Sequence, residues 1–368
     1  MKLIHCADLH LDSVLTTHLT KEKAKERKAE LLQTFLRMVD YAVENEVEAI
    51  LIAGDLFDKK NISATARNAV KHAIQENNQI TFFYLQGNHD VNFFLRSEEK
   101  RPENLKCFGE EWSSYILGED GKKLVVSGLE LSRNNAGYAG HSLSLNLENF
   151  NIVMLHGQDS QYEVKDKTEV IPLELFKNKG IDYLALGHIH SYKMEPLDGR
   201  GNYCYSGCLE GRGFDECGKH GFVLLDINLN SGEYTTQFIP FAFRNLYAVP
   251  VDISGCMNTL EIEEKIKKKL HDGGYEKSSL IKVVLEGEVD VECEKNTDYL
   301  ADWLKNEYYY LQVRDNSHVR IDYDAYVYDE SLKGEFVRTV RGIEEMPEED
   351  KGAIIRFGIQ ALTGEDIV

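Results

Sequence analysis

The sequence has little of the residues that mark several classes of protein. It contains only 6 prolines and 28 glycines in 368 residues, which excludes collagen-like and proline-rich disordered chains. There is no low-complexity tract and no internal repeat, which disfavours solenoids and propellers. With 42% hydrophobic residues the composition indicates a globular protein, and the length predicts about two domains.

Long apolar runs are missing too. Runs such as Ala49–Ala53 fall far short of the roughly 20 residues that a membrane-spanning helix needs. Residues Met1–His10 are interrupted by His5, Asp8 and His10, and they therefore lack the apolar segment of a secretory signal. We expect no membrane association and a cytoplasmic location.

Cysteines are few and scattered, and none forms a CxxC pair; they stand at positions 6, 107, 204, 208, 217, 256 and 293. Their odd number favours free thiols in a reducing compartment. A zinc site at Cys204, Cys208 and Cys217 is the alternative, although its spacing is irregular for a structural site.

Positive charge is also scarce. The 42 Lys and Arg residues are outnumbered by 62 Asp and Glu residues, which gives a net charge of −20 with neutral His. This balance opposes a surface that coats nucleic acid by bulk electrostatics. A bound polyanion would need local help, such as metal ions.

What the sequence does have is an alternation of short apolar runs and polar, helix-compatible stretches. Runs of four or five apolar residues suit strands buried on both faces, so the pattern predicts an α/β fold. We expect helices at Lys21–Asn45 and Ser63–Glu76, and strands at Lys2–Cys6, Ala49–Ala53, Thr81–Leu85, Lys123–Leu129, Ile152–Leu155, Tyr183–Leu186, Tyr203–Ser206 and Gly221–Asn228.

The pattern changes after Pro240–Arg244. A smaller α+β domain is expected, with strands at Leu246–Ile253 and Leu280–Glu286 and helices at Leu260–Leu270 and Tyr299–Tyr310. We therefore divide the chain into a main domain at 1–240, a second domain at 245–315 and a C-terminal extension at 316–368.

The extension contains a predicted helix at Pro347–Leu362, whose acidic first turn suits the helix dipole. Its apolar residues Ile354, Phe357, Ala361 and Leu362 fall at helical spacing and predict one hydrophobic side. This side either packs onto the chain itself or docks onto a partner protein.

Five predicted strands end at clusters of Asp, Asn or His, and the carboxyl ends of strands line the ligand crevice of open α/β sheets. The clusters are Asp8-Leu9-His10, Gly54-Asp55-Leu56-Phe57-Asp58, Gly87-Asn88-His89-Asp90, His156-Gly157 and Gly187-His188-Ile189-His190. Each cluster alone could be turn chemistry or a buried histidine. Together they indicate a metal centre.

The candidate ligands are too many for one tetrahedral ion, so two ions are implied; they are Asp8, His10, Asp55, Asn88, His156, His188 and His190. Mixed oxygen and nitrogen ligands without thiolate suit Mn²⁺ or Fe²⁺ and permit Zn²⁺. Two ions about 3.5–4 Å apart can clamp both the attacking and the leaving oxygen of a phosphate ester. The sequence therefore predicts phosphoester hydrolysis.

The order and the residues of these motifs resemble those of the calcineurin-like metallophosphoesterase superfamily, and more closely those of the SbcD-type DNA repair exonucleases. The closer resemblance covers roughly residues 1–240 and lies in Ile4–Asp12, Ala53–Asp58, Tyr205–Cys208 and Gly211–Phe214. It implies a β-sandwich flanked by helices, followed by a smaller α+β cap that guides DNA to the metals.

The resemblance also implies roles for the candidate residues. One metal would be held by Asp8, His10, Asp55 and His190, and the other by Asp55, Asn88, His156 and His188. Asp55 would bridge the two metals, His89 would face the scissile phosphate, and Asp90 would orient His89. Asp58 stands where some archaeal and eukaryotic members carry His, which weakens the transfer of substrate details from those members.

We therefore expect a hydrolase, specifically a Mn²⁺-dependent DNA exonuclease and endonuclease. The resemblance implies an SbcC-like coiled-coil ATPase as partner, and a homodimer formed through helices within Ile62–Asn77 and Val91–Asn104. A metallophosphodiesterase or phosphatase acting on a smaller substrate is the alternative. A scaffold that has lost activity is disfavoured by the full ligand set.

The cap carries features that could bind DNA. Lys265 and Lys267–Lys269 give one helix a basic face, which either guides DNA or is only solvated. Tyr308–Tyr310 could stack on bases, although successive residues of a helix face different directions.

Overall fold

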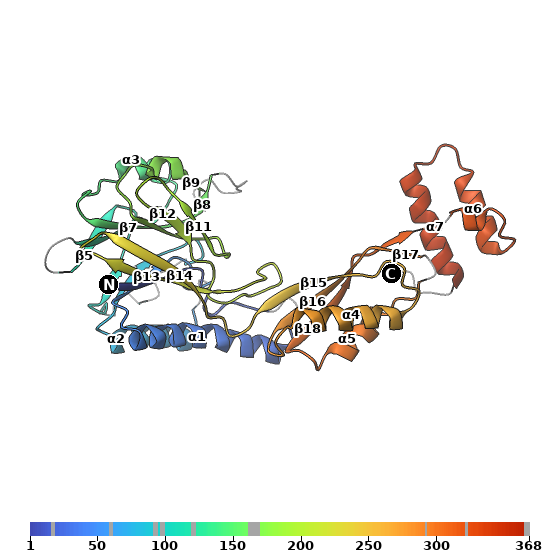
Figure 1. Cartoon of the computed structure of the whole chain (residues 1–368), viewed down its shortest axis with the longest axis horizontal. Coiled ribbons are helices and arrows are strands. Elements are labelled where there is room, and N and C mark those ends of the chain that lie inside the picture. The colour runs from blue at the N-terminus through green and yellow to red at the C-terminus, as the bar shows by residue number, and fades with distance from the viewer. Residues whose placement is uncertain are drawn as a thin grey trace. The chain divides into compact units, whose positions relative to one another are not determined.

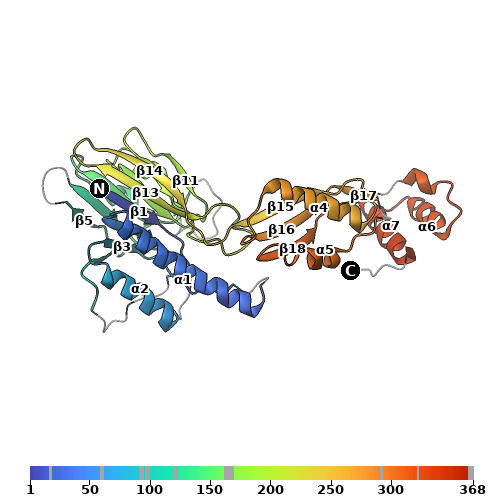
Figure 2. The ribbon, with the colours of Figure 1, turned by 60° about the horizontal axis from the view of Figure 1, so that its bottom comes forward.

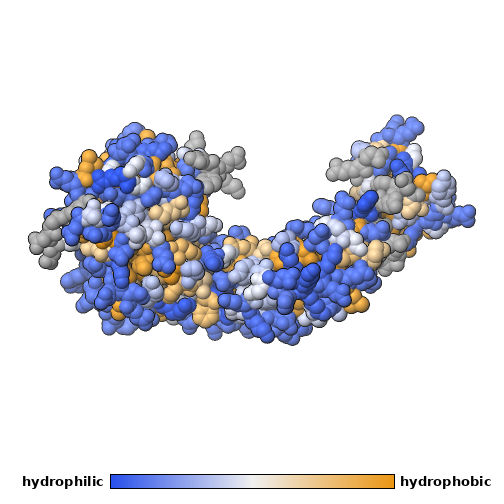
Figure 3. Space-filling view, in the orientation of Figure 1, coloured by the Kyte–Doolittle hydropathy of each residue, from blue (hydrophilic) through white to orange (hydrophobic). Residues whose placement is uncertain are grey.

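The computed structural model describes residues 1–15, 19–58, 62–90, 95, 100–118, 123–160, 170–290, 293–320 and 323–363. The chain divides into two compact units, Met1–Asn245 and Leu246–Val368 (Figure 1). The face of the molecule in Figure 3 is mostly hydrophilic, with apolar side chains in small groups. None of the described helices combines the length and the apolar character needed to span a bilayer.

The first unit contains two six-stranded sheets. In the first sheet, parallel strands β1 to β4 are extended at one edge by two antiparallel strands; these are β1 (Lys2–Cys6), β2 (Ala49–Ala53), β3 (Thr81–Leu85), β4 (Leu105–Cys107), β13 (Gly221–Asn228) and β14 (Glu233–Pro240). In the second sheet, four parallel strands carry an antiparallel strand at each edge; in spatial order these are β11 (Lys193–Pro196), β12 (Asn202–Tyr205), β10 (Tyr183–Gly187), β7 (Phe150–His156), β6 (Leu124–Gly128) and β5 (Ser113–Leu117).

The two sheets share one hydrophobic core. Leu51 and Phe83 of the first sheet and Ile152 and Met154 of the second are all fully buried in the same cluster. The other side of the first sheet packs against α1 (Lys21–Glu44) and α2 (Ala64–Glu76), as Figure 2 shows. The predicted α/β sandwich flanked by helices is therefore confirmed.

The second sheet is covered on its outer side by shorter segments. These are α3 (Ala139–Ser142) and a 3₁₀ helix at Leu173–Phe176, whose apolar side chains pack with Leu184 and Leu186 of β10. Two further strands, β8 (Gln158–Asp159) and β9 (Val170–Ile171), pair with each other in parallel.

The second unit is built on a parallel three-stranded sheet of β15 (Leu246–Asp252), β16 (Leu280–Glu286) and β18 (Tyr310–Asp315). Helices α4 (Thr259–Gly273) and α5 (Thr297–Leu304) share a core with its buried face. The unit also contains β17 (Glu288–Asp290), β19 (His318–Arg320), a 3₁₀ helix at Tyr323–Tyr326, α6 (Leu332–Arg341) and α7 (Glu348–Thr363). The separate boundary expected after residue 315 stays a prediction.

The helix predicted at Tyr299–Tyr310 is wrong in its second half. Helix α5 ends at Leu304, and Tyr310 is already the first residue of β18, where it pairs with Leu280. Tyrosine has a high strand propensity, and pairing with a strand distant in sequence decides its conformation here. The three tyrosines of the cap therefore do not lie on one helix.

The hydrophobic side predicted for the C-terminal helix is also wrong. Ile355 and Ile359 are the fully buried residues of α7, and they pack with Val337 and Val340 of α6. The expected side is instead exposed: Ile354 and Phe357 have 39% and 40% of their surface accessible, and Leu362 has 41%. Adjacent isoleucines allowed either face to be buried, and the helix packs onto its own chain through the face not predicted.

Candidate metal centre

The loops after β1, β2, β3, β7 and β10 meet where these strands end, and backbone hydrogen bonds join them. The Asp8 amide donates to Gly54 O at 3.1 Å, and the His10 amide donates to Asp55 O at 2.9 Å. The His188 amide donates to both carboxylate oxygens of Asp8, each at 3.0 Å. The five predicted clusters are thus brought to one place.

The side chains of Asp8, His10, Asp55 and His190 converge. Their donor atoms fall into groups in which all atoms lie within 4.8 Å of one another; Asp8, His10 and His190 form one such group, and Asp8, Asp55 and His156 form another. His10 Nε2 lies 3.3 Å from His190 Nε2 and 3.7 Å from Asp55 Oδ2.

The remaining predicted ligands lie beside these groups. His156 Nε2 lies 3.4 Å from Asp55 Oδ2 and 3.0 Å from Asn88 Oδ1. The His188 ring meets the His156 ring edge to face, with 5.4 Å between their centroids. All seven predicted ligands are therefore found at one site.

The electrostatics of the site fit bound cations. Asp8 and Asp55 are each only 1% exposed, and buried charge is costly without a partner of opposite sign. Burial lowers the pKa of His156, but the neighbouring charge of Asp55 outweighs it and raises this pKa to about 10. Two imidazole Nε2 atoms that face each other at 3.3 Å, as in His10 and His190, also suit a shared cation.

The backbone of the site is strained. Asp8, His10, Asp55 and His188 have positive φ angles of 52°, 44°, 53° and 96°, a region that L-residues rarely adopt. Such residues cost about 1–3 kcal/mol each and persist only where the surrounding structure holds them. Strain concentrated on four of seven candidate ligands is typical of a functional site.

Glycines allow these side chains to come close. A Cβ on Gly54 would collide with the His156 ring, and a Cβ on Gly87 would collide with the Asp55 carboxylate. The Gly-Asp and Gly-Asn steps of the sequence motifs therefore have a steric reason.

His89 lies beside this group and is half exposed. Its Nδ1 is 3.0 Å from Asp58 Oδ1, and its backbone amide donates to Asp55 Oδ1 at 2.9 Å. The hydrogen bond with Asp58 raises the pKa of His89. Asp58 also lies 3.3 Å from His10 Nδ1 and accepts a hydrogen bond from Ser13 at 2.8 Å.

Asp90 does not reach His89, which corrects the expectation that it orients this ring. Its buried carboxylate accepts hydrogen bonds from the amides of Leu56, Phe57 and Gly87 at 3.1, 2.8 and 3.1 Å. Because its oxygens are engaged by backbone, Asp90 braces the loops after β2 and β3. Asp58 occupies the position expected for Asp90.

Two residues at the site were not assigned a role from sequence. Glu216 Oε1 lies 2.7 Å from His190 Nδ1, the ring nitrogen opposite the one facing His10. Arg212 donates to Glu216 through Nη2 at 2.8 Å. A partner of this kind fixes the orientation of a ligand histidine. In the sequence, the motif Gly211–Phe214 was the feature that could have pointed to Arg212. The motif alone did not show which groups this arginine contacts.

The cysteines do not form a zinc site among the described residues. Cys208 Sγ lies 3.1 Å from His220 Nδ1, Cys217 is exposed, and all seven cysteines are free thiols. Among the described residues, the groups of possible metal ligands include no cysteine.

Comparison with known proteins agrees with this geometry. The family model described as calcineurin-like phosphoesterase matches residues 1–192, which include all the candidate ligands. The chain belongs to the calcineurin-like phosphoesterase family. Members use a dinuclear metal centre, and this chain is accordingly a metal-dependent hydrolase.

Several curated proteins are similar to this family member. An uncharacterized metallophosphoesterase, YhaO of Bacillus subtilis, is 29% identical over 251 residues, which cover 65% of this chain and 60% of that protein. DNA double-strand break repair protein Mre11 of Sulfolobus acidocaldarius is 24% identical over 312 residues, covering 79% of this chain and 76% of that protein. Mre11 of Sulfurisphaera tokodaii is 27% identical over 315 residues, covering 78% and 73%.

Solved structures are more distant. A protein from Thermus thermophilus has a TM-score of 0.41 and 13% identity, with 64% of this chain and 97% of that chain covered. A dimetal phosphatase from Danio rerio has a TM-score of 0.39 and 11% identity, with 61% and 92% covered.

Proposed function

We propose that this phosphoesterase is a nuclease that hydrolyses phosphodiester bonds of DNA. The observation that carries the proposal is the extent of the similarity to the archaeal proteins named Mre11. It covers 79% and 78% of this chain, whereas the family model ends at residue 192. The similarity therefore continues past the part that carries the candidate ligands.

In this proposal, Asp8, His10, Asp55 and His190 would hold one metal. Asn88, His156 and His188 would hold the other, and Asp55 would contribute to both sites. The donor set of carboxylates, imidazoles and one amide suits Mn²⁺ best and admits Fe²⁺ or Zn²⁺. When bound, such metals polarise the phosphate and make hydroxide available near neutral pH.

His89 acts on the scissile phosphate. The hydrogen bond with Asp58 raises the pKa of His89 and so favours the protonated form of its ring. A protonated imidazole can stabilise the developing negative charge and assist departure of the deoxyribose oxygen. Its half exposure leaves the ring accessible to a large substrate such as DNA.

The second unit guides DNA in this proposal. Lys265 donates to the Ser254 carbonyl at 2.8 Å, and Lys267 Nζ lies 4.4 Å from the centre of the Trp303 ring. These two lysines are partly engaged within the unit, so Lys268 and Lys269 are the better candidates for contacting phosphates.

Partners complete the proposal. We infer an SbcC-like coiled-coil ATPase that supplies much of the DNA-binding surface, since a chain with a net charge of −20 is expected to bind DNA weakly alone. The exposed side of α7, with Ile354, Phe357 and Leu362, is the candidate docking surface. A homodimer through Ile62–Asn77, which contains α2, stays a prediction, and most of Val91–Asn104 lies outside the described residues. The cytoplasmic location also stays a prediction.

A phosphodiesterase or phosphatase for smaller substrates is the second candidate. The similarity to YhaO of Bacillus subtilis, an uncharacterized metallophosphoesterase, leaves this substrate class open. The candidate metal centre would serve both functions equally, because metals there would contact only the phosphate.

The test measures hydrolysis of end-labelled duplex DNA and, separately, of bis-p-nitrophenyl phosphate, both with Mn²⁺. We expect both substrates to be cleaved, and His89→Gln to lower the rate on DNA by about 10²–10⁴-fold while metal binding is retained. The loss should be smaller for the small ester, because p-nitrophenolate departs without a proton. Cleavage of the small ester without DNA cleavage, even after the ATPase partner is added, would favour the second candidate. Metal binding without any hydrolysis would favour a scaffold.

A further inference from the structure

Arg212 brings a fixed positive charge to a site otherwise built from carboxylates, imidazoles and an amide. It belongs to the motif Gly211–Phe214, which lies in the segment between β12 and β13. Its side chain is only 19% exposed, so the guanidinium is largely enclosed by its neighbours. Arg212 is not one of the metal ligands proposed above, and the proposed function assigns it no role.

One edge of the guanidinium is held in place by Glu216. Arg212 Nε and Nη2 donate to Glu216 Oε1 at 3.2 and 2.8 Å, and the Arg212 amide donates to Oε2 at 2.8 Å. Glu216 Oε1 also lies 2.7 Å from His190 Nδ1. A single carboxylate therefore sets the position of Arg212 relative to a proposed metal ligand.

The other edge of the guanidinium makes a long ion pair but no hydrogen bond among the described residues. Arg212 Nη1 lies 3.8 Å from Asp58 Oδ1, which is too long for a hydrogen bond, and it donates no hydrogen bond to any described residue. Asp58 in turn holds His89 at 3.0 Å. The unused N–H groups of Nη1 thus lie next to the carboxylate that orients the proposed catalytic histidine.

An arginine with such an edge is suited to a phosphate. Guanidinium N–H groups form charge-assisted hydrogen bonds with phosphate oxygens, and the planar group gives these bonds a defined direction. An arginine held on one edge by a carboxylate loses little further side-chain freedom when it binds an anion.

We infer that Arg212 is a substrate-binding residue whose Nη1 donates to a non-bridging oxygen of the scissile phosphate, on the same side as His89. The inference rests on the proposed metal centre but not on DNA being the substrate. Glu216 is then a positioning residue, because it holds both Arg212 and His190 without contacting the phosphate.

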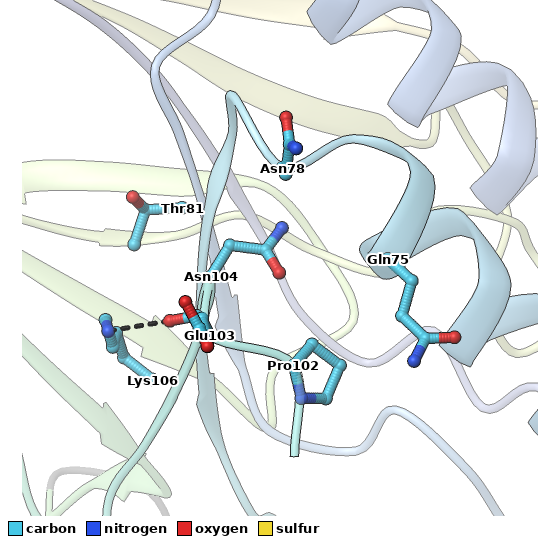
Figure 4. A pocket seen from close by; sticks show the side chains of 7 residues that line it. All are labelled: Gln75, Asn78, Thr81, Pro102, Glu103, Asn104 and Lys106. Carbon is cyan, nitrogen blue, oxygen red and sulfur yellow. Dashed lines mark hydrogen bonds between the residues drawn. The ribbon is translucent and has the colours of Figure 1, made fainter. Parts of the chain in front are cut away.

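The test compares Arg212→Met and Arg212→Lys with the wild type, and it uses binding of inorganic phosphate to the Mn²⁺-loaded protein, measured by calorimetry. Lys106→Gln is the matched control for loss of one positive charge. Lys106 donates to the Glu103 carbonyl at 2.7 Å and lines a polar pocket at the start of β3, together with Gln75 and Thr81 (Figure 4).

We expect Arg212→Met to weaken phosphate binding about tenfold or more, because a hydrogen bond to a charged group is lost. Arg212→Lys should recover part of this loss, and both variants should bind Mn²⁺ as the wild type does. Phosphate binding that is equally tight in Arg212→Met and Lys106→Gln would overturn the inference. So would a wild type that binds Mn²⁺ but no phosphate.

Kinetics separate this inference from the proposed nuclease. Arg212→Met should reduce kcat/KM by the same factor for DNA and for bis-p-nitrophenyl phosphate, which carries a single phosphate. A defect confined to DNA would mean contact with a neighbouring phosphate and would overturn the assignment to the scissile one. If the wild type cleaves neither substrate while Arg212→Met still weakens phosphate binding, the nuclease proposal fails and the role of Arg212 stands.

Discussion

Single carboxylates determine how the candidate catalytic histidine is held. Asp90 is next to His89 in sequence, yet its oxygens accept hydrogen bonds from three backbone amides. Burial raises the pKa of Asp90 to about 6, whereas the pKa of Asp58 is well below its usual range because hydrogen bonds from His10 and His89 outweigh the effect of burial. Of these two carboxylates, Asp58 is the one in contact with the His89 ring, because its Oδ1 lies 3.0 Å from His89 Nδ1.

Replacing Asp58 should impair departure of the leaving group. We expect Asp58→Asn to lower kcat on DNA about a hundredfold, because His89 loses the charge that favours its protonated form. The loss should be smaller for bis-p-nitrophenyl phosphate, since p-nitrophenolate departs without a proton. Steady-state rates on both substrates check this prediction.

Asp90→Asn provides the comparison. An amide offers one acceptor oxygen to three backbone donors, so this variant should lower the melting temperature. It should affect the two substrates by the same factor. A stronger dependence on the leaving group in Asp90→Asn than in Asp58→Asn would contradict the roles given to these residues.

At the scale of elements, α1 anchors the segment that carries Arg212. Arg27 of α1 is 1% exposed and donates to Glu30 at 2.6 Å, to Glu210 at 3.2 Å and to the Gly211 carbonyl at 2.9 Å. Thr34, two turns further along the helix, donates to the other Glu210 oxygen at 2.7 Å. The packing of α1 thus reaches the loop next to the candidate metal centre.

Removal of this buried arginine should be strongly destabilising. We expect Arg27→Met to lower the free energy of unfolding of the first unit by about 3–5 kcal/mol, because the Glu210 charge stays buried without its partner. The double variant Arg27→Met with Glu210→Gln should be less destabilised than the sum of its parts.

Urea denaturation, followed by a signal from the first unit, measures these effects. Lys25→Met changes an exposed charge on the same helix and should alter stability by no more than about 0.5 kcal/mol. An Arg27→Met variant as stable as Lys25→Met would mean that the buried network contributes nothing to the fold.

The whole molecule consists of two compact units, and among the described residues only the first contains the candidate metal centre. Two buried carboxylates and four residues with positive φ make this centre costly to form without cations. The free energy of metal binding should therefore appear as stability of the first unit.

Metal addition should raise the melting temperature of the first unit. At a free Mn²⁺ concentration of about 100 times Kd, mass action stabilises a folded site by roughly 2.7 kcal/mol. Scanning calorimetry with and without a chelator measures the shift, and a transition of the second unit should not move.

Asp55→Ala should abolish the metal-induced shift, because Asp55 belongs to both proposed metal sites. Asp226→Ala removes an exposed carboxylate of β13, opposite Lys2 at the start of β1. This variant should retain the metal-induced shift. An equal shift in the two variants would place the metal elsewhere.

The interior strands of the sandwich and the candidate ligands follow from the sequence alone. The boundaries of β1, β2, β3 and β13 agree with those predicted, and α1 begins at the predicted residue. A buried parallel strand must be apolar along its whole length, so it is visible in sequence. Ligands directly after such strands are equally visible, because strand ends meet at one edge of a sheet.

The short edge strand β5 was not predicted. Its residues alternate between half-buried and exposed, so they make no continuous apolar run. The buried side of α7 was predicted wrongly, because Ile354 and Ile355 offer two possible faces and only packing against α6 selects one.

The contacts that organise the site were decided by tertiary structure. Asp58 rather than Asp90 holds His89, and Glu216 holds both His190 and Arg212. Asp58 and His89 lie on the loops after two different strands, and their contact depends on how the sheet places those loops. Local sequence predicts which residue types end each strand, whereas the partner of each side chain depends on distances that exist only after the strands have assembled.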